Sequence, residues 1–385
     1  MEKSFIRRFS RKLLLLIYWT VAIGFILGCY AGFFFRSYTW PVGLLPLVSA
    51  YLLAVFTLLA FIWLLFKSKW CILYPVCVII CWKPITHIIG LRTESVWNNQ
   101  KQAGQIRVLS WNAAQFNILD GKRKPGHKPA MIQVMNDYEP DIICIQEMVA
   151  ADTLINLNTP YYKKYSFFTI FDFADQLRMP QFHYSYNFRE DFLVHQHFGL
   201  TIFSKYPMIR KETVGIYPNG YNDFFQFADI VKGQDTFRVF NIHLQSLRFS
   251  RTNLVYIDNP TMDESSDIEK SKSVLGKFKR ALMKRKKQAD RVREEIDKSP
   301  YPVILCGDFN DVPNSYAYHL IGKGMENAFQ QCGSGIGRTF SKISPTLRID
   351  NIFASEDHFK FSQYDRNTRN LSDHYPIVAD LYYHK

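Results

Sequence analysis

The sequence lacks the cysteine patterns that build disulfide scaffolds and zinc sites. It has seven cysteines in 385 residues and no CxxC pair. Four cysteines lie in the apolar N-terminal region, and the others are Cys144, Cys306 and Cys332. A disulfide framework and a cysteine-based metal site are therefore excluded. Cys144 and Cys306 lie inside apolar strand-like runs, and we interpret them as buried, inert thiols.

Acidic residues are in short supply. Lysine and arginine number 47 against 34 aspartates and glutamates, which gives a formal net charge of +13. Such an excess suits an anionic partner, such as a phosphate ester, nucleic acid or acidic lipid head groups. The charge alone identifies none of these, and we predict no protein partner.

Charges are also missing from two long stretches near the N-terminus. Residues 13–35 and 41–66 contain no charged side chain, and each is longer than the roughly 20 residues that cross a bilayer. No small-residue cleavage site follows the first stretch and a second span does, so we expect an anchor and not a removed signal peptide. The lipid bilayer is thus an expected partner of residues 1–91.

A third crossing depends on residues 70–91, an apolar segment that Lys83 and Pro84 interrupt. The basic residues at 1–12 and in the loop 67–69 favour the cytoplasm. Two crossings would keep the C-terminal domain inside, whereas three would place it outside the cytoplasm, in the periplasm if the source is bacterial. We favour three crossings. The alternative is a helix that lies in the membrane interface or inserts halfway.

After a linker at residues 92–104, we expect one soluble domain at residues 105–385, in which strands and helices alternate. Strands are predicted at 106–110, 141–145, 200–204, 237–242, 303–306, 347–353 and 377–381. Helices are predicted at 128–138 and 271–298, the second after a long polar loop at 245–271. The stretch 160–198 is rich in Tyr and Phe and indicates no particular element.

The stretch at residues 302–313, PVILCGDFNDVP, is the one around which the rest is organised. An apolar run predicts a buried strand that stops at Gly307, and Asp308, Asn310 and Asp311 follow at once. A rigid strand that ends in a carboxylate and an amide can hold a metal ion or polarise a water molecule. A strand followed by an Asx-type turn is the ordinary alternative.

Other predicted strands also end in polar side chains. The residues that close them are Asn112, Glu147, His243, Asp308, Asn310, Asp350, Asp373 and His374. Each alone has an ordinary explanation, as a turn or helix cap, a surface charge or a satisfied core histidine. Burying unpaired carboxylates is costly. Their recurrence at strand ends therefore favours a shared metal ion and a phosphate that offset this cost.

In their order along the chain, these motifs resemble the endonuclease/exonuclease/phosphatase superfamily, in particular its deoxyribonuclease and sphingomyelinase branches. The motifs are Trp111-Asn112, Gln146-Glu147, Asn241 to His243, Gly307 to Asn310, Arg348 to Asp350, and Ser372 to His374. The resemblance covers residues 105–385. It implies an α/β fold, a four-layer α/β/β/α sandwich with its site at one edge of two packed sheets, here preceded by N-terminal transmembrane helices.

The resemblance also implies a divalent cation, Mg²⁺ or alternatively Mn²⁺. Glu147 would be the main metal ligand, helped by Asn112 and Asp373. Oxygen ligands suit a hard cation, and Mg²⁺ typically binds through one or two carboxylates plus the substrate phosphate.

The same resemblance implies roles for the other polar residues. Asp308 would orient or deprotonate the attacking water, and Asn310 would hold a phosphate oxygen. His374, with its tautomer fixed by Asp350, would stabilise charge on phosphorus or assist the leaving group. His243 would donate a second hydrogen bond to the phosphate. The implied chemistry is in-line attack of water on a phosphodiester.

Two positions depart from the family pattern. Ala114 stands where some members carry an acidic residue, which puts a second metal ion in doubt, and Asn351 replaces the common aromatic residue after Asp350. Some branches also place a tyrosine or arginine on the substrate phosphate. We do not identify this residue here, and the stretch 160–198 is its candidate source.

The helix predicted at 271–298 is strongly basic between Lys277 and Arg293. This charge fits three interpretations. It is typical of a solvated helix face, of an electrostatic footprint for DNA or RNA, and of contact with acidic lipid head groups close to a membrane anchor.

We therefore hypothesise a membrane-anchored, metal-dependent hydrolase of phosphodiester bonds, similar to a nuclease. Within this class, a phospholipid or small-molecule phosphoesterase is the alternative: tethering favours lipids, whereas the positive charge favours nucleic acid. A non-catalytic, membrane-tethered binding module is the alternative from another class. Loss of Glu147, Asp308 or His374 would have favoured that module, and all three residues are present.

Overall fold

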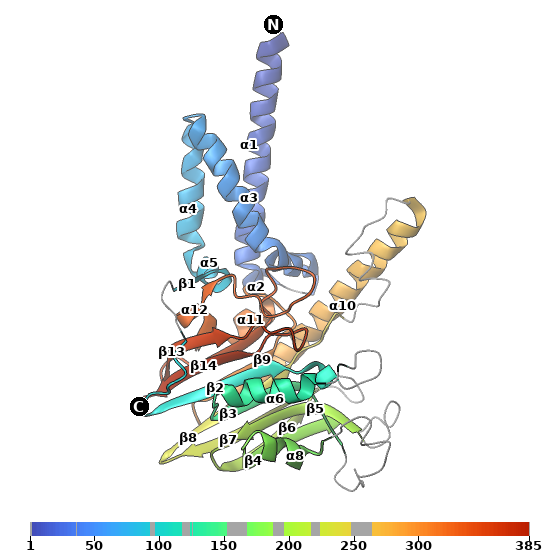
Figure 1. Cartoon of the computed structure of the whole chain (residues 1–385). Coiled ribbons are helices and arrows are strands. Elements are labelled where there is room, and N and C mark those ends of the chain that lie inside the picture. The colour runs from blue at the N-terminus through green and yellow to red at the C-terminus, as the bar shows by residue number, and fades with distance from the viewer. Residues whose placement is uncertain are drawn as a thin grey trace.

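The computed structural model describes residues 2–35, 37–92, 97–117, 124, 126–151, 168–187, 196–216, 224–247 and 264–384. Within these residues, two six-stranded sheets pack against each other and helices cover their outer faces. A group of apolar helices extends away from one end of this sandwich (Figure 1). The structure confirms the predicted α/β/β/α architecture, preceded by apolar helices.

The first sheet has the strand order β13-β14-β2-β3-β5-β4. Its strands are β2 (Gln105–Asn112), β3 (Ile142–Ala151), β4 (Gln181–Asn187), β5 (Gln196–Ser204), β13 (Phe359–Arg366) and β14 (Ile377–Tyr383). Strands β2 and β3 are parallel, and the other neighbours are antiparallel. Helices α6 (His127–Asp137) and α8 (Ile170–Gln176) cover the outer face, where Met131, Met135 and Phe173 are buried.

The second sheet has the order β10-β12-β9-β8-β7-β6. Its strands are β6 (Met208–Gly215), β7 (Phe224–Lys232), β8 (Asp235–His243), β9 (Val303–Asp308), β10 (Met325–Asn327) and β12 (Asp350–Ser355). Strands β8 and β9 are its parallel pair. Helices α10 (Glu264–Asp297) and α11 (Tyr316–Ile321) cover its outer face, and α12 (Ala328–Cys332) packs near β12 and β13.

The core between the sheets explains the continuous apolar runs in the sequence. Val108, Cys144, Ile202, Ile304 and Cys306 are fully buried there. Strands that are covered on both faces do not alternate between apolar and polar residues. Burial also raises the pKa of the Cys144 thiol, which disfavours the reactive thiolate. This agrees with the interpretation of these cysteines as inert.

The predicted strands and helices are all present, with boundaries that differ by a few residues. Strands β4, β6, β7 and β13 were not predicted. Strand β6, for example, lies at a sheet edge and is mostly exposed, so it has no apolar run to reveal it. The predicted loop at 245–271 is wrong in its last part, because α10 already begins at Glu264. Residues 248–263 lie outside the described residues.

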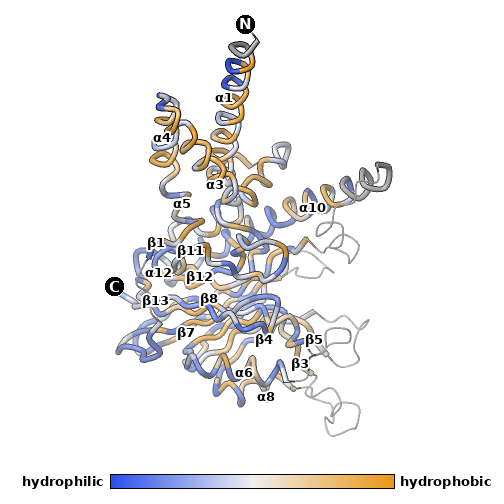
Figure 2. Tube along the Cα trace, turned by 45° about the horizontal axis from the view of Figure 1, so that its top comes forward, coloured by the Kyte–Doolittle hydropathy of each residue, from blue (hydrophilic) through white to orange (hydrophobic). Residues whose placement is uncertain are grey.

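The N-terminal helices form an apolar bundle (Figure 2). They are α1 (Glu2–Cys29), α2 (Ala31–Phe34), η1 (Trp40–Leu44), α3 (Leu45–Leu65), η2 (Lys69–Ile72), α4 (Leu73–Ile80) and α5 (Trp82–Ile88). Two helical stretches, Ile6–Cys29 and Trp40–Leu65, are long and apolar enough to cross a membrane. The stretches Lys69–Ile80 and Trp82–Ile88 meet at a bend of 73° and count as a third span only if they are taken together.

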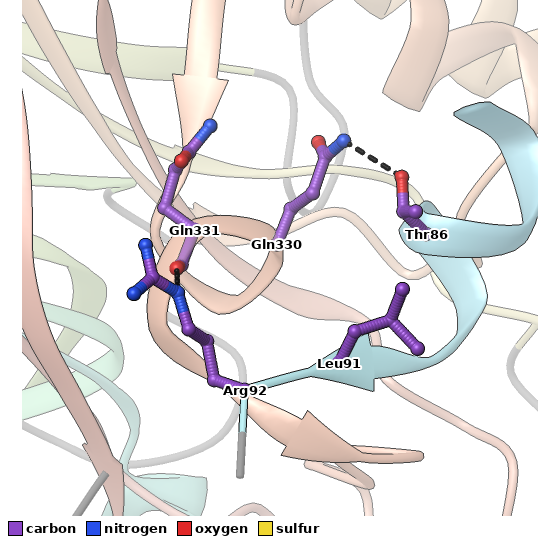
Figure 3. Close-up of a pocket in the computed structure, with 5 residues that line it drawn as sticks. All are labelled: Thr86, Leu91, Arg92, Gln330 and Gln331. Atoms are coloured by element: carbon purple, nitrogen blue, oxygen red, sulfur yellow. Dashed lines mark hydrogen bonds between the residues drawn. The ribbon is translucent and has the colours of Figure 1, made fainter. Parts of the chain in front are cut away.

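The end of this bundle is hydrogen-bonded to the sandwich through a contact that we call the anchor seam, between residues 84–92 and the domain. Strand β1 (Gly90–Leu91) pairs with β11 (Ser334–Gly335). The Gln330 amide donates to the Thr86 hydroxyl at 3.0 Å, and Arg92 Nε donates to the Gln331 carbonyl at 2.8 Å (Figure 3). The predicted anchor and linker thus contribute residues that pack on the catalytic domain.

Candidate active site

Three neighbouring strands of the second sheet bring three site residues side by side. In the parallel β8–β9 pair, His243 lies opposite Asp308. In the antiparallel β9–β12 pair, Asp350 lies opposite the same Asp308. All three are buried. The strand ends therefore converge at one edge of the sheet, as the sequence predicts.

The carboxylate of Asp308 is the centre of this cluster. Its Oδ2 accepts a hydrogen bond from Asn112 Nδ2 at 3.0 Å, and lies 3.5 Å from His243 Nε2 and 3.7 Å from His374 Nε2. Its Oδ1 accepts the backbone N–H of Asn310 at 2.7 Å. Burial raises the pKa of Asp308, while the neighbouring imidazoles oppose this shift. Five predicted residues therefore meet at a single carboxylate.

His374 is held by Asp350 on the side away from Asp308. Its Nδ1 lies 3.0 Å from Asp350 Oδ2 and 3.2 Å from Oδ1. Burial lowers the pKa of His374, but the charges of Asp350 and Asp308 outweigh it and raise the pKa to about 10. The Phe340 ring lies 4.9 Å from the imidazole, and Thr339 Oγ1 accepts the N–H of Asp350 at 3.1 Å. His374 is thus a protonated, fixed imidazolium between two carboxylates.

The two sheets are joined at this edge by a contact that we call the catalytic seam. It consists of the Asn112–Asp308 bond and a second bond, from Gln146 Nε2 to Asn241 Oδ1 at 2.7 Å. The amide of Asn241 also donates to the carbonyls of Ile145 and Thr201. Gln146 and Asn241 belong to the sequence motifs, yet no role for them was predicted. Their role here is to hold the sheets in register.

Glu147 follows Gln146 at a break in the ladder of β3. The pairing of β3 with β5 shifts register between Ile145 and Met148, and Glu147 has a φ of 48°. Such a bulge redirects a side chain, and left-handed non-glycine residues concentrate at functional sites. The half-buried Glu147 carboxylate accepts a hydrogen bond from Gln115 Nε2 at 2.8 Å. Because Gln146 pairs with Asn112, Glu147 adjoins the cluster.

Asp373 is tied to the end of β2 by its neighbours. Ser372 Oγ donates to the Asn112 carbonyl at 2.9 Å and lies 3.4 Å from Asp373 Oδ1. Trp111 Nε1 donates to the His374 carbonyl at 2.9 Å. The half-buried Asp373 carboxylate is therefore held beside the cluster, next to Asn112.

Two groups of side chains could hold a metal ion. Asp308, Asp350 and His374 offer ligand atoms within 4.8 Å of one another. In that group, however, the imidazolium already neutralises both carboxylates, so a cation would have to displace it. The other group is the predicted one, and its members are Glu147, Asn112 and Asp373. These are oxygen donors, which a hard divalent cation prefers, and they adjoin the cluster without being part of its ion pairs.

One buried ion pair near the site was not predicted. Arg285 of α10 donates from Nε to Asp311 Oδ2 at 3.1 Å and from Nη1 to the Gln245 carbonyl at 3.2 Å. The signal was present, since Asp311 stands in the central stretch and Arg285 in the basic helix. Later bases of this helix also have acidic partners, as in the Arg291–Glu294 pair at 2.9 Å. Part of the basic run is therefore structural.

Comparisons with known proteins agree with this geometry. A model of the endonuclease/exonuclease/phosphatase family matches residues 109–374. A second family model, for a domain of unknown function, matches residues 11–88. No curated protein sequence matches the chain.

Solved structures share the fold. The endonuclease/exonuclease/phosphatase of Beutenbergia cavernae is 18% identical, with a TM-score of 0.52 and 72% of both chains covered. The human Nocturnin catalytic domain is 15% identical, with a TM-score of 0.49 and coverage of 76% of this chain and 100% of its own. The family protein of Bacteroides thetaiotaomicron is 18% identical, with a TM-score of 0.47 and coverage of 73% and 98%.

The matched family model runs from β2 to the last site motif and so spans most of the chain. It contains every motif residue around which the cluster is built, from Trp111 to His374. The chain therefore belongs to the endonuclease/exonuclease/phosphatase family.

Proposed function

We propose that this protein is a membrane-anchored, divalent-cation-dependent phosphodiesterase. Members of its family are hydrolases that act on phosphoester bonds. The observation that carries the proposal is the surroundings of Asp308, whose carboxylate meets an amide from one sheet and two imidazoles from the other. Packing alone does not require this arrangement, because it buries several ionisable groups together.

In this proposal, Asp308 orients the attacking water and takes its proton. The N–H of Asn310 fixes the carboxylate orientation, and a fixed base is what general base catalysis requires. The new P–O bond forms in line with the ester bond that breaks, and the leaving oxygen departs with a proton. His374, protonated and braced by Asp350, is positioned to supply that proton or to stabilise charge on the phosphoryl group.

His243 and Asn310 would bind the phosphoryl oxygens. His243 Nε2 faces Asp308, so its imidazole lies where a phosphate approaching the base would pass. The Asn310 amide donates to the Leu244 carbonyl at 2.9 Å, which sets its orientation. Fixed donors of this kind stabilise a transition state without reorganising during the reaction.

Glu147, with Asn112 and Asp373, would hold the cation, which we propose to be Mg²⁺, with Mn²⁺ as the alternative. A cation bound there would polarise a phosphoryl oxygen. The bulge that turns Glu147 out of the sheet ladder supports this assignment.

The anchor supports a catalytic domain outside the cytoplasm. The connection between α1 and α3 lies on the domain: the Gly32 N–H donates to the Asn314 carbonyl at 3.1 Å, and the rings of Phe33 and His319 are 3.9 Å apart. If both helices cross the bilayer, this connection and the domain share one side. The basic N-terminus and the loop 67–69 then lie on the other side, which positive charge marks as cytoplasmic. The segment α4–α5 must then complete a third crossing to bring the chain back.

Nucleic acid is one candidate substrate, favoured by the positive charge, and a phospholipid head group is the other. A specific contact favours the lipid. Tyr51 of α3 shares a hydrogen bond with Ser344 at 2.8 Å, and the same loop carries Phe340, which packs on His374. This loop also exposes Ile336 and Ile343. The active site is thus one loop away from a helix that we expect in the bilayer.

The test uses the full chain in nanodiscs, supplied with bis(p-nitrophenyl) phosphate, a DNA oligonucleotide or phospholipid, with Mg²⁺ or with EDTA. We expect hydrolysis in Mg²⁺ only, and a loss of about 1,000-fold or more in Asp308→Asn, which keeps the shape but removes the base. Asp357→Asn, at an exposed turn, is the matched control and should equal wild type. An Asp308→Asn variant as active as the control would reject the proposal. Stable folding without turnover of any substrate would favour the non-catalytic module.

A further inference from the structure

A cavity of about 360 Å³ lies between the bundle and the catalytic domain, away from the Asp308 cluster. We call it the junction cavity. One wall comes from the end of α1, from α2 and from α5, with Tyr30, Phe33 and Lys83. The other comes from α11 and the turn after it, with His319 and Lys323. None of the proposed catalytic residues lines it.

The charge that faces the junction cavity is mainly positive. Burial lowers the pKa of His319, and the charges of Lys83 and Lys323 lower it further, so both ammonium groups lie near this imidazole. Neither lysine forms an ion pair with any described residue. Glu356 is the acidic side chain on the wall. Two exposed ammonium groups beside a half-buried imidazole form a site for an anion.

The cavity lies at the level where the bundle would leave a bilayer. Tyr30 follows the last residue of α1, and its hydroxyl donates to the Ile80 carbonyl at the end of α4 at 2.6 Å. Phe33 and Trp82 beside it are each 55% exposed. Aromatic and lysine side chains at the ends of apolar helices mark the head-group region of a membrane.

We propose that the junction cavity binds the phosphate head group of an anionic phospholipid. The lysines would contact the phosphate, and the acyl chains would run along the apolar surface of the bundle past Phe33. Basic pockets between membrane helices bind anionic lipids in this way. The inference rests on the proposed insertion of the bundle into a bilayer, but not on the proposed hydrolysis, and the cavity is distinct from any substrate site.

A lipid in this cavity would bridge the anchor and the domain. Asn314 lines the cavity and already donates to the Pro84 carbonyl at 3.1 Å. A ligand that binds only the folded state stabilises it according to its affinity. Bound lipid should therefore raise the temperature at which the full chain unfolds.

The experiment compares the full chain in nanodiscs of phosphatidylcholine alone and of phosphatidylcholine mixed with phosphatidylglycerol. We expect the mixed lipid to raise the midpoint of thermal unfolding by about 2–4 °C. The double variant Lys83→Ala/Lys323→Ala should lose this gain. Lys360→Ala, which removes an exposed lysine on β13, should keep it.

Three results would overturn the inference. The double variant would keep the full gain if the effect came from elsewhere on the protein. Inorganic phosphate added to phosphatidylcholine discs would give the same gain if the cavity held a free anion and not a lipid. Native mass spectrometry of the wild type would release phosphatidylglycerol as readily as phosphatidylcholine, a readout that does not depend on the variant folding. Failure of the chain to enter nanodiscs would reject the anchor itself, while hydrolysis would still be testable in detergent.

Discussion

The two seams of this molecule are built differently. At the catalytic seam, side chains meet side chains, as Gln146 meets Asn241 and Asn112 meets Asp308. At the anchor seam, domain side chains largely meet backbone carbonyls, as Asn314 meets Pro84 and Arg348 meets His87. A carbonyl is available from every residue type. The anchor seam is therefore set by the path of the backbone, whereas the catalytic seam is set by residue identity.

The largest effect should come from removing the anchor seam as a whole. A chain that starts at residue 97 loses β1 and the partners of Asn314, Gln330 and Arg348. Several buried donors then lack acceptors, at about 1–3 kcal/mol each. We expect its unfolding midpoint in detergent to lie about 10 °C below that of a chain that starts at residue 69. Equal midpoints would mean that the seam contributes nothing to the domain.

At the catalytic seam, Asp350→Asn should impair turnover more than folding. The amide cannot hold the His374 imidazolium as the carboxylate does, so the imidazole loses both charge and orientation. We expect kcat to fall about 100-fold, or about 2.7 kcal/mol, with an unfolding midpoint near that of wild type. Steady-state kinetics beside the exposed Asp357→Asn control measure this. A kcat within a factor of three of the control would remove Asp350 from the site.

At the anchor seam, Arg348→Lys should do the reverse. The buried Arg348 guanidinium bonds to the His87 carbonyl and to Asn327 and Asn351, and it lies 4.2 Å from the Phe329 ring. A lysine cannot reproduce this planar fork, so we expect a loss of about 1–3 kcal/mol of stability in chemical denaturation.

Arg369→Lys, at an exposed position, is the control for this change and should be neutral. If Arg348→Lys is neutral as well, the backbone carbonyl contributes little, and the contrast between the two seams would not hold.

The smallest effect is expected for Tyr51→Phe. It removes only the hydrogen bond between α3 and Ser344, which lies at an exposed position and should contribute less than about 1 kcal/mol. Tyr38→Phe, at a residue that is 84% exposed, is the matched control. Thermal unfolding should separate the two variants by no more than about 2 °C. A larger separation would make this loop a principal support of the anchor.

The difference between the seams also explains what the sequence could predict. Asn112, His243, Asp308, Asp350 and His374 are visible because a carboxylate, amide or imidazole at the end of an apolar strand is unusual. Their convergence follows from the strand order, and the structure confirms it.

Other features leave no such signal. Gln146 and Asn241 could be assigned a motif but not a partner, because pairing across two sheets depends on how the sheets pack. The bond from Arg348 to the His87 carbonyl could not be predicted, since no residue type marks a carbonyl. Strand β6 is polar and exposed, so its pairing with β7 and not its composition makes it a strand.

The most direct test of the central claim is the Mg²⁺ dependence of phosphodiester hydrolysis by the full chain. The account predicts no turnover in EDTA, and saturation as Mg²⁺ is added. It also predicts that Glu147→Gln requires on the order of 100-fold more Mg²⁺ for half-maximal rate. Undiminished hydrolysis in EDTA, or a Glu147→Gln variant with the wild-type Mg²⁺ requirement, would contradict it.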